Sequence, residues 1–137
     1  MPRVSGILET CLYVDDLRRS VEFYERVFEF DSLGGDDRFH AFDVAGRDVL
    51  LLFKKGGTLK PVQMPFGVIP EHDGSGENHF AFSITPMELP RWEQFLAQQK
   101  ITIESRVTWP RGGVSLYFRD PDRHLVELLT PGVWKTY

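Results

Sequence analysis

One glutamate stands in the middle of an otherwise apolar stretch near the end of the chain. Residues 125–129 are Leu-Val-Glu-Leu-Leu, and the Asp-Pro-Asp at residues 120–122 has the composition of a tight turn. Side chains alternate between the two faces of a strand, so Glu127 shares a face with Leu125 and Leu129. A buried carboxylate is costly unless it is neutralised, paired or bound to a metal. Glu127 is therefore either a solvated strand-edge residue or a candidate metal ligand.

The elements that would position Glu127 belong to a pattern that occurs twice along the chain. Alternating apolar residues predict strands, and apolar residues at helical spacing predict one helix in each half. The first half predicts a strand at 7–14, a helix capped by Asp15 or Asp16 and ending near 30, a turn at 34–37, and a hairpin of 39–44 with 48–53. The second half predicts a strand at 79–84, a helix near 87–99, and strands near 101–104, 115–119 and 125–129. Residues 54–78 are rich in proline and glycine and predict a linker and surface loop.

Superposing the two halves brings ligand-type side chains to equivalent positions. Glu9 falls on His79, and Leu51 falls on Glu127. In isolation, Glu9 would be interpreted as a solvated strand residue and His79 as a satisfied core histidine. If the halves pair about a pseudo-twofold axis, however, all four positions converge on one cavity. The equivalence across the repeat therefore favours a shared site.

Three motifs resemble those of the vicinal oxygen chelate superfamily, which includes glyoxalase I, bleomycin-resistance proteins, extradiol dioxygenases and fosfomycin-resistance enzymes. The motifs lie at residues 12–24, 78–82 and 118–127, so the resemblance covers nearly the whole chain. It implies an α+β fold in which two paired βαβββ modules form a cupped mixed sheet around a metal cavity.

The same resemblance implies one domain over residues 1–137, with modules at about 5–55 and 78–131 joined by a linker at about 56–77. It also implies a homodimer, in which the metal site is built either within one chain or across two.

The superfamily's metal ligands lie in the first and last strands of each module. Carried over by position, they fall on Glu9, His79 and Glu127, while Leu51 takes the place of a fourth ligand and cannot bind a metal. The resemblance therefore implies a divalent ion, Mn²⁺, Fe²⁺, Ni²⁺ or Zn²⁺, with coordination positions open to substrate. Glu127 or Glu9 would also be catalytic, detaching from the ion to act as a base, as is proposed for glyoxalase I.

Four further residues are candidate substrate contacts. The spacing of Ser115 and Tyr117 before the Asp-Pro-Asp turn is similar to that in fosfomycin-resistance enzymes, where the matching residues help to hold substrate; ordinary strand residues are the alternative. Arg111, in a loop at 109–113 expected to be flexible, is either an anion contact or a solvated arginine. Cys11 is expected to line the cavity rather than to act as a nucleophile. The remaining histidines are interpreted as surface or structural residues: His40, His72 and His124.

Composition excludes several other classes. A formal net charge of −4 and scattered basic residues argue against nucleic-acid binding. No apolar run approaches the roughly 18 residues that a membrane span needs. The only cysteine, Cys11, excludes an internal disulfide. We therefore expect a cytoplasmic protein, and the resemblance implies that it acts on a small molecule.

The function expected from these observations is that of a metal-dependent lyase or isomerase of the glyoxalase type, which binds adjacent substrate oxygens and stabilises an enolate or oxyanion. The missing ligand at Leu51 departs from glyoxalase I. A ring-cleaving dioxygenase and a fosfomycin-type transferase are alternatives. The resemblance implies two histidine ligands and one carboxylate ligand in those enzymes, and here Glu9 replaces one of the histidines. A metal-free, bleomycin-type drug-binding protein is the alternative from another class.

Overall fold

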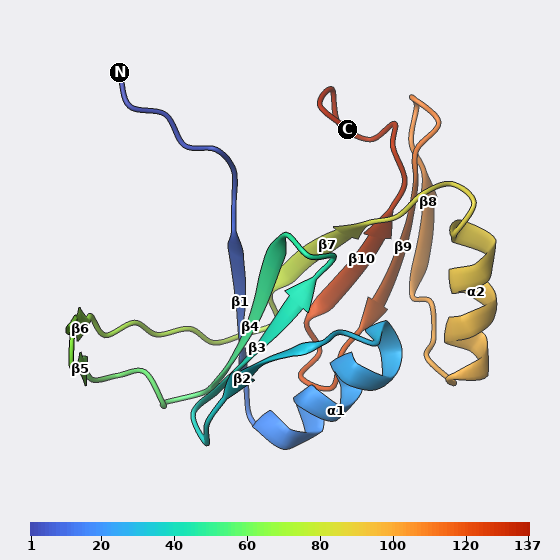
Figure 1. The fold of residues 1–137 in the computed structure, drawn as a ribbon. Helices are drawn as coiled ribbons and strands as arrows, with labels where there is room; N and C mark the ends of the chain where they lie inside the picture. The colour runs from blue at the N-terminus through green and yellow to red at the C-terminus, as the bar shows by residue number, and fades with distance from the viewer. The chain divides into compact units, whose positions relative to one another are not determined.

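The computed structural model describes residues 1–137, which divide into two compact units, Met1–Gly76 and Glu77–Tyr137. Each unit has a four-stranded sheet and one helix (Figure 1). Neither helix has the length and apolar character needed to cross a bilayer. The α+β class predicted from the sequence is confirmed.

The first unit has the element order β-α-β-β-β followed by a short hairpin. Its elements are β1 (Glu9–Val14), α1 (Leu17–Phe28), β2 (Ser32–Gly35), β3 (Phe39–Val44), β4 (Asp48–Lys54), β5 (Val62–Met64) and β6 (Gly67–Ile69). The sheet order is β1-β4-β3-β2, with β1 parallel to β4 and the other pairs antiparallel. As predicted, Asp16 caps α1, accepting from the backbone amide of Arg19 at 3.0 Å. The buried face of α1 packs on β3 and β4.

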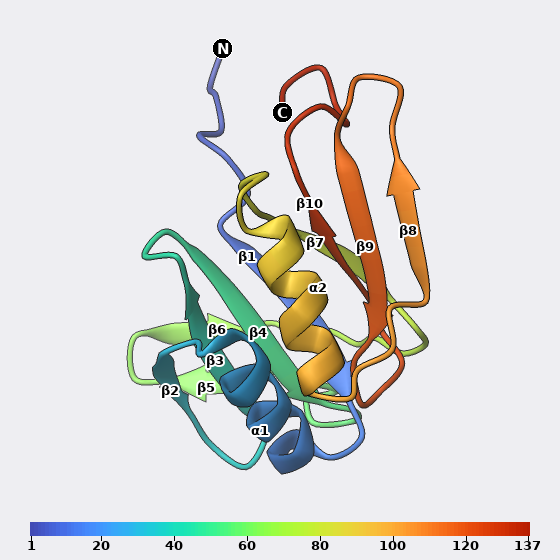
Figure 2. The same cartoon turned by 90° about the vertical axis from the view of Figure 1, so that its right-hand side faces the viewer.

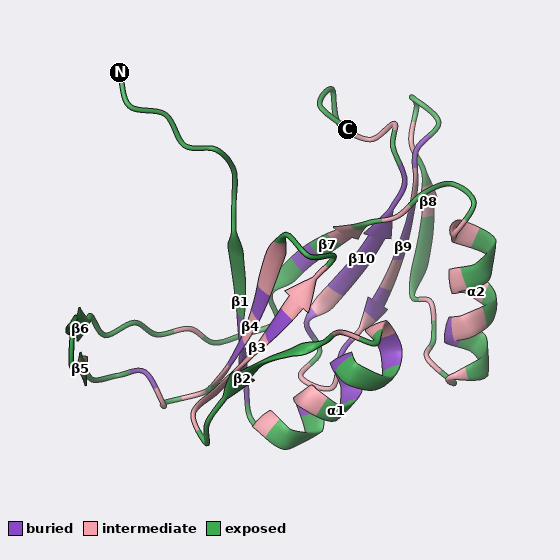
Figure 3. Cartoon of the chain, viewed as in Figure 1, coloured by how far each residue is buried: buried purple, intermediate pink, exposed green.

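The second unit repeats the β-α-β-β-β order. Its elements are β7 (His79–Ser83), α2 (Leu89–Gln98), β8 (Ser105–Thr108), β9 (Val114–Arg119) and β10 (Leu125–Leu129). The sheet order is β7-β10-β9-β8, again with the first pair parallel and the others antiparallel. Figure 2 shows α2 lying across one face of this sheet. Nearly all of β10 is buried (Figure 3).

Strand register confirms the superposition of the two halves. Glu9 lies opposite Val49 in the parallel β1–β4 pair, and His79 lies opposite Leu125 in the parallel β7–β10 pair. Val49 therefore corresponds to Leu125, and two residues further along the strand Leu51 corresponds to Glu127. The internal equivalence inferred from the sequence holds at the level of the backbone.

Three local predictions were wrong. Residues 32–35 form strand β2 where a turn beginning at 34 was predicted, because the two glycines of this strand carry no strand signal. Residues 101–104 are not a strand, which begins instead at Ser105. The predicted linker contains the hairpin β5–β6, whose strands have three residues each and no buried residue, too short a stretch for a periodic signal (Figure 3).

Candidate metal and substrate site

His79 and Glu127 lie together on one face of the second sheet. His79 is the first residue of β7, and Glu127 is the middle residue of β10. The Nε2 atom of His79 lies 3.2 Å from Oε2 of Glu127. Glu127 is 6% exposed, whereas half of the His79 side chain is accessible. The buried carboxylate thus has a close partner, as the cost of its desolvation requires.

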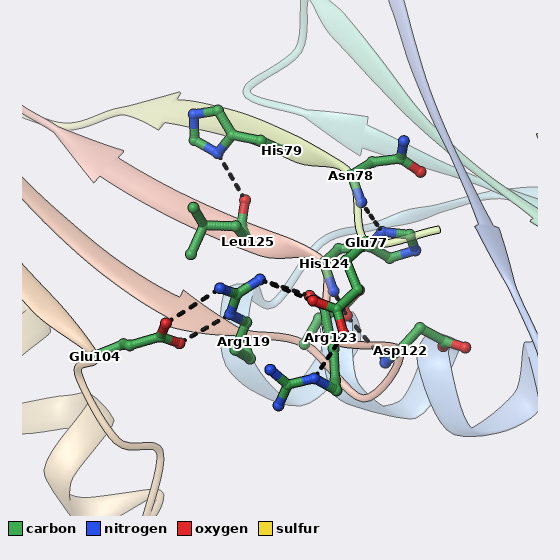
Figure 4. Close-up of polar contacts among 10 residues, drawn as sticks. Glu77, Asn78, His79, Glu104, Arg119, Asp122, Arg123, His124 and Leu125 are labelled. Atoms are coloured by element: carbon green, nitrogen blue, oxygen red, sulfur yellow. Dashed lines mark hydrogen bonds and ion pairs between the residues drawn. The ribbon is translucent and has the colours of Figure 1, made fainter. Parts of the chain in front are cut away.

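The backbone of β10 sets the tautomer of His79. The Nδ1 atom of His79 lies 3.0 Å from the carbonyl oxygen of Leu125 (Figure 4). Because a carbonyl oxygen only accepts hydrogen bonds, Nδ1 carries a proton, and Nε2 is the ring nitrogen that faces Glu127. Histidines that bind metals use this same arrangement, in which the second ring nitrogen donates to a carbonyl or a carboxylate.

A buried histidine fixes the point at which β7 begins. His124 is fully buried, and its Nδ1 accepts from the amide of Asn78 at 2.9 Å (Figure 4). The amide of Leu125 donates to the Asn78 carbonyl at 2.8 Å. Asp120 holds the other side of the turn by accepting from the His124 amide at 2.8 Å. His124 is structural, as predicted, and it anchors the residue directly before His79.

A row of hydrogen-bonding side chains on β9 leads to Glu127. Tyr117 is the direct cross-strand neighbour of Glu127 in the antiparallel β9–β10 pair. Ser115, two residues earlier on the same face, is fully buried. Burial raises the pKa of Tyr117, the hydrogen bond to Glu127 raises it further, and a hydrogen bond with Ser115 opposes the rise. Tyr117 is therefore a neutral phenol at physiological pH and can donate to a negatively charged oxygen.

The loop before β9 is a tight turn, which corrects the expectation of a flexible segment. The amide of Trp109 donates to the Gly113 carbonyl at 2.8 Å, and the amide of Gly112 donates to the Trp109 carbonyl at 2.9 Å. The indole Nε1 of Trp109 donates to the Ser115 hydroxyl at 2.8 Å. Sequence reasoning missed this contact. The only signal for it was that Trp109 and Ser115 lie six residues apart on the two sides of a hairpin.

Ion pairs tie β9 to the segments that precede β7 and β8 (Figure 4). Arg119 binds both carboxylate oxygens of Glu104, at 2.8 and 3.1 Å, and also lies 3.6 Å from Glu77. Arg123 donates to Glu77 at 2.7 Å. The hydrogen bond from Arg119 lowers the pKa of Glu104. This network stabilises the entry to β7, where His79 lies.

In the first unit, Glu9 and Cys11 are exposed on one face of β1, and Leu51 lies opposite Cys11. Burial of the sulfur raises the pKa of Cys11, and the charge of Glu9 raises it further, so the thiol is protonated at neutral pH. No group of three or more histidine, cysteine or acidic residues in the structure could hold a metal ion. Of the three predicted ligands, His79 and Glu127 meet within one unit, and Glu9 belongs to the other.

The other predicted residues have simpler surroundings. Arg111 is exposed at the tip of the β8–β9 turn. His72 is an exposed residue, as predicted, but its Nδ1 is hydrogen-bonded to the hydroxyl of Tyr13, and its ring meets Phe53 edge-on. The hydroxyl of Thr58 donates to the His72 carbonyl at 2.5 Å, which closes the base of the segment that carries β5 and β6, and the contact with Tyr13 attaches that base to β1.

Two β-α-β-β-β units, the second with a histidine at the start of its first strand and a carboxylate in its last, define the class of folds built from a βαβββ repeat. The chain belongs to the Glyoxalase/Bleomycin resistance protein/Dioxygenase superfamily, whose family model matches residues 6–128. The resemblance found in the sequence motifs is thus confirmed.

Individual relatives point to two kinds of enzyme. The chain is 32% identical to the metallothiol transferase FosB of Bacillus licheniformis over 133 residues, which cover 96% of this chain and 79% of the relative. It is 31% identical to the crystal structure of a lactoylglutathione lyase from Agrobacterium tumefaciens, with a TM-score of 0.88, 98% of this chain covered and 99% of that one. The fold also matches the fosfomycin resistance protein FosX of Listeria monocytogenes complexed with Mn(II) and sulfate, at 22% identity, a TM-score of 0.68 and coverages of 93% and 91%.

Proposed function

We propose that this protein is a divalent-metal-dependent enzyme that adds a thiol to a small, anionic, oxygen-rich substrate of the fosfomycin type. The observation that carries the proposal is the placement of Tyr117 and Ser115 on the same sheet face as a buried Glu127 that lies 3.2 Å from His79. The arrangement provides a phenol donor for an anionic group, supported by a buried hydroxyl, next to two candidate metal-ligand side chains. This choice replaces the glyoxalase-type reaction as the leading expectation.

The residues of the second unit fit a divalent ion. The lone pair on Nε2 of His79 and the carboxylate of Glu127 are a nitrogen and an oxygen donor that face one another. A borderline ion such as Mn²⁺, Fe²⁺, Ni²⁺ or Zn²⁺ suits this mixture. Glu9 is the third ligand of the proposal, by its equivalence to His79 in the repeat. Two carboxylates would balance the charge of the ion.

Each side chain of the site has a distinct part in the proposed reaction. When bound, the ion supplies Lewis acidity that stabilises negative charge on substrate oxygens. Tyr117, kept protonated by its raised pKa, turns its single proton from Glu127 to an anionic oxygen of the substrate when substrate binds. Ser115 supports Tyr117 from the buried side. Arg111, exposed on the adjoining turn, adds a positive charge that attracts an anionic substrate, and Cys11 lines the site as a protonated thiol.

A glyoxalase-type lyase is the second candidate, because the lactoylglutathione lyase structure matches 98% of this chain at a TM-score of 0.88. Leu51, where glyoxalase I keeps a fourth ligand, counts against that reaction. Glu9 counts against the transferase, because it replaces a histidine ligand of the fosfomycin-type enzymes. The hydroxyl pair favours the transferase, since FosB at 32% identity is a metallothiol transferase. A homodimer in the cytoplasm remains part of the proposal.

Metal content is the first measurement. We expect elemental analysis to find about one transition-metal ion per chain in the purified protein, and the Glu127→Ala variant to lose it, because removing a ligand costs more than the 10- to 100-fold typical of supporting residues. Glu93→Gln, which removes a carboxylate from α2 of the same unit, outside the network at the entry to β7, is the matched control and should retain the ion. A native protein that is metal-free and binds none of the four ions would favour a metal-free binding role.

Substrate choice separates the two enzymes. The Mn²⁺-loaded protein would be incubated with fosfomycin and either cysteine or glutathione, and in parallel with the hemithioacetal of methylglyoxal and glutathione. We expect a thiol adduct of fosfomycin that requires Tyr117. Turnover of the hemithioacetal alone would establish the lyase instead. Turnover of neither substrate would show that the protein catalyses neither reaction.

A further inference from the structure

Trp109 donates a hydrogen bond to Ser115, yet the proposed reaction gives Trp109 no role. The indole Nε1 can only donate, so it occupies one lone pair of the Ser115 oxygen, at 2.8 Å. Ser115 is fully buried, which prevents water from competing for its hydroxyl. A hydroxyl has a single proton to donate, and Trp109 cannot accept it. The proton of Ser115 must therefore be directed at another acceptor.

Tyr117 is that acceptor. It lies two residues from Ser115 on the same face of β9 and opposite Glu127 on β10, and its hydroxyl is hydrogen-bonded to both. A carboxylate oxygen accepts, so the single phenol proton of Tyr117 is donated to Glu127, and Tyr117 accepts the proton of Ser115. The donors are therefore ordered in one direction, from Trp109 through Ser115 and Tyr117 to Glu127.

The backbone around Trp109 is built to hold the indole still. Gly113 ends the turn, and a Cβ added to it would lie 2.6 Å from the carbonyl carbon of Gly132, so the two backbones are packed together. The amide of Gly113 donates to the Gly132 carbonyl at 3.3 Å, and the amide of Val114 donates to the Thr130 hydroxyl at 2.8 Å. The turn that carries Trp109 is thus fastened to the segment that follows β10.

We propose that Trp109 is a positioning residue for the anion-binding hydroxyl of Tyr117: its indole N–H orients Ser115, and Ser115 in turn orients the Tyr117 hydroxyl toward the metal-ligand side of the sheet. This inference rests on the proposed function and adds to it the group that prepares the site for an anionic oxygen. A hydroxyl whose direction is fixed before binding loses less rotational freedom when a phosphonate or carboxylate oxygen arrives.

The test uses methylphosphonate as the probe, and the full-length protein with and without Mn²⁺. Trp109→Phe keeps most of the ring volume and removes the donor. Trp134→Phe, which removes an indole from a side chain that is 69% exposed, is the matched control. Methylphosphonate affinity is measured by calorimetry, thermal unfolding reports stability, and the indole N–H resonances are followed by NMR in the metal-free protein.

We expect Trp109→Phe to weaken methylphosphonate binding about three- to tenfold, the size of one neutral hydrogen bond, with no effect of Trp134→Phe. In a Tyr117→Phe background the same substitution should no longer change affinity, although it should still change the unfolding temperature. Tyr117→Phe should also shift the Trp109 indole resonance and leave that of Trp134 in place. A purely structural tryptophan would produce the loss of stability without this dependence on Tyr117.

Three results would overturn the inference: native affinity in a folded Trp109→Phe protein, a Trp109→Phe affinity loss that persists when Tyr117 is absent, or no methylphosphonate binding by the native protein. Failure of the proposed function gives a different pattern. If methylphosphonate binds and depends on Trp109 through Tyr117, but neither fosfomycin nor the hemithioacetal is turned over, the positioning role stands and the reaction must be another one.

Discussion

At the scale of single residues, the site depends on a carboxylate placed where hydrophobic residues would be more stable. Glu127 lies in the middle of β10, between the fully buried Val126 and Leu128. His79 and Tyr117 both approach it, so a candidate metal-ligand nitrogen and one neutral donor lie beside its charge. A sheet designed only for stability would place an apolar side chain here, because unmatched buried charge is costly.

Cys11 is expected to be a slow nucleophile despite its exposure. Burial of the sulfur and the charge of Glu9 raise its pKa, which lowers the fraction of reactive thiolate at pH 8. Alkylation by iodoacetamide, followed by mass spectrometry, should be slower than that of free cysteine and should accelerate in Glu9→Gln. Alkylation as fast as that of free cysteine would contradict this description of the β1 surface.

At the scale of elements, the ion-pair network of Glu104 with Arg119 predicts a pH dependence. The pKa of Glu104 is lowered in the folded protein, so its contribution to stability is present above its unfolded pKa of 4.5 and is lost as the pH falls through the lower folded value. The native protein should therefore have a higher unfolding temperature than Glu104→Gln at pH 7, and the two temperatures should be equal well below pH 4.5. A difference that persists in acid would mean that packing, not charge, is responsible.

The turn between β8 and β9 should tolerate no side chain at Gly113. The added Cβ would meet the backbone of Gly132 at 2.6 Å, where neither chain can move without breaking the turn. Gly113→Ala should destabilise the protein by about 1 to 3 kcal/mol, the usual cost of overpacking. Gly6→Ala is the control, since nothing lies within 4 Å of its position. Chemical denaturation of both variants measures the difference.

At the scale of the whole molecule, the proposal takes Glu9 from the first unit of a chain and His79 and Glu127 from the second unit, of the same chain or of its partner. We expect a homodimer of twice the 15.8 kDa chain mass in light scattering, and we expect Glu9→Ala to weaken Mn²⁺ binding at least about tenfold, as loss of a ligand should. Metal binding equal to that of the native protein would remove Glu9 from the ligand set.

Mixing the Glu9→Ala and Glu127→Ala variants then decides which chain supplies Glu9. If the site is shared between chains, each mixed dimer contains one complete ligand set, so refolding the two variants together restores part of the Mn²⁺ binding. If every site lies within one chain, no mixed dimer has a complete set, and the mixture binds no better than the variants alone.

The sequence by itself determined the repeat, the type of each main element and the identity of the metal-ligand candidates. These follow from local patterns: the period of apolar residues, the Asp16 cap, and the equivalence of Glu9 with His79 and of Leu51 with Glu127, which strand register confirms. They depend on neighbours along the chain or on symmetry between halves, both of which are visible in one dimension.

Only the tertiary structure decided how the candidate residues are prepared for chemistry. The tautomer of His79 is set by the Leu125 carbonyl, 46 residues away in the chain, and the direction of the Ser115 hydroxyl is set by Trp109. The weak strands β2, β5 and β6 also emerged only in the structure. The physical reason is that hydrogen bonds between distant segments, and strands with no buried face, leave no periodic signal in the sequence.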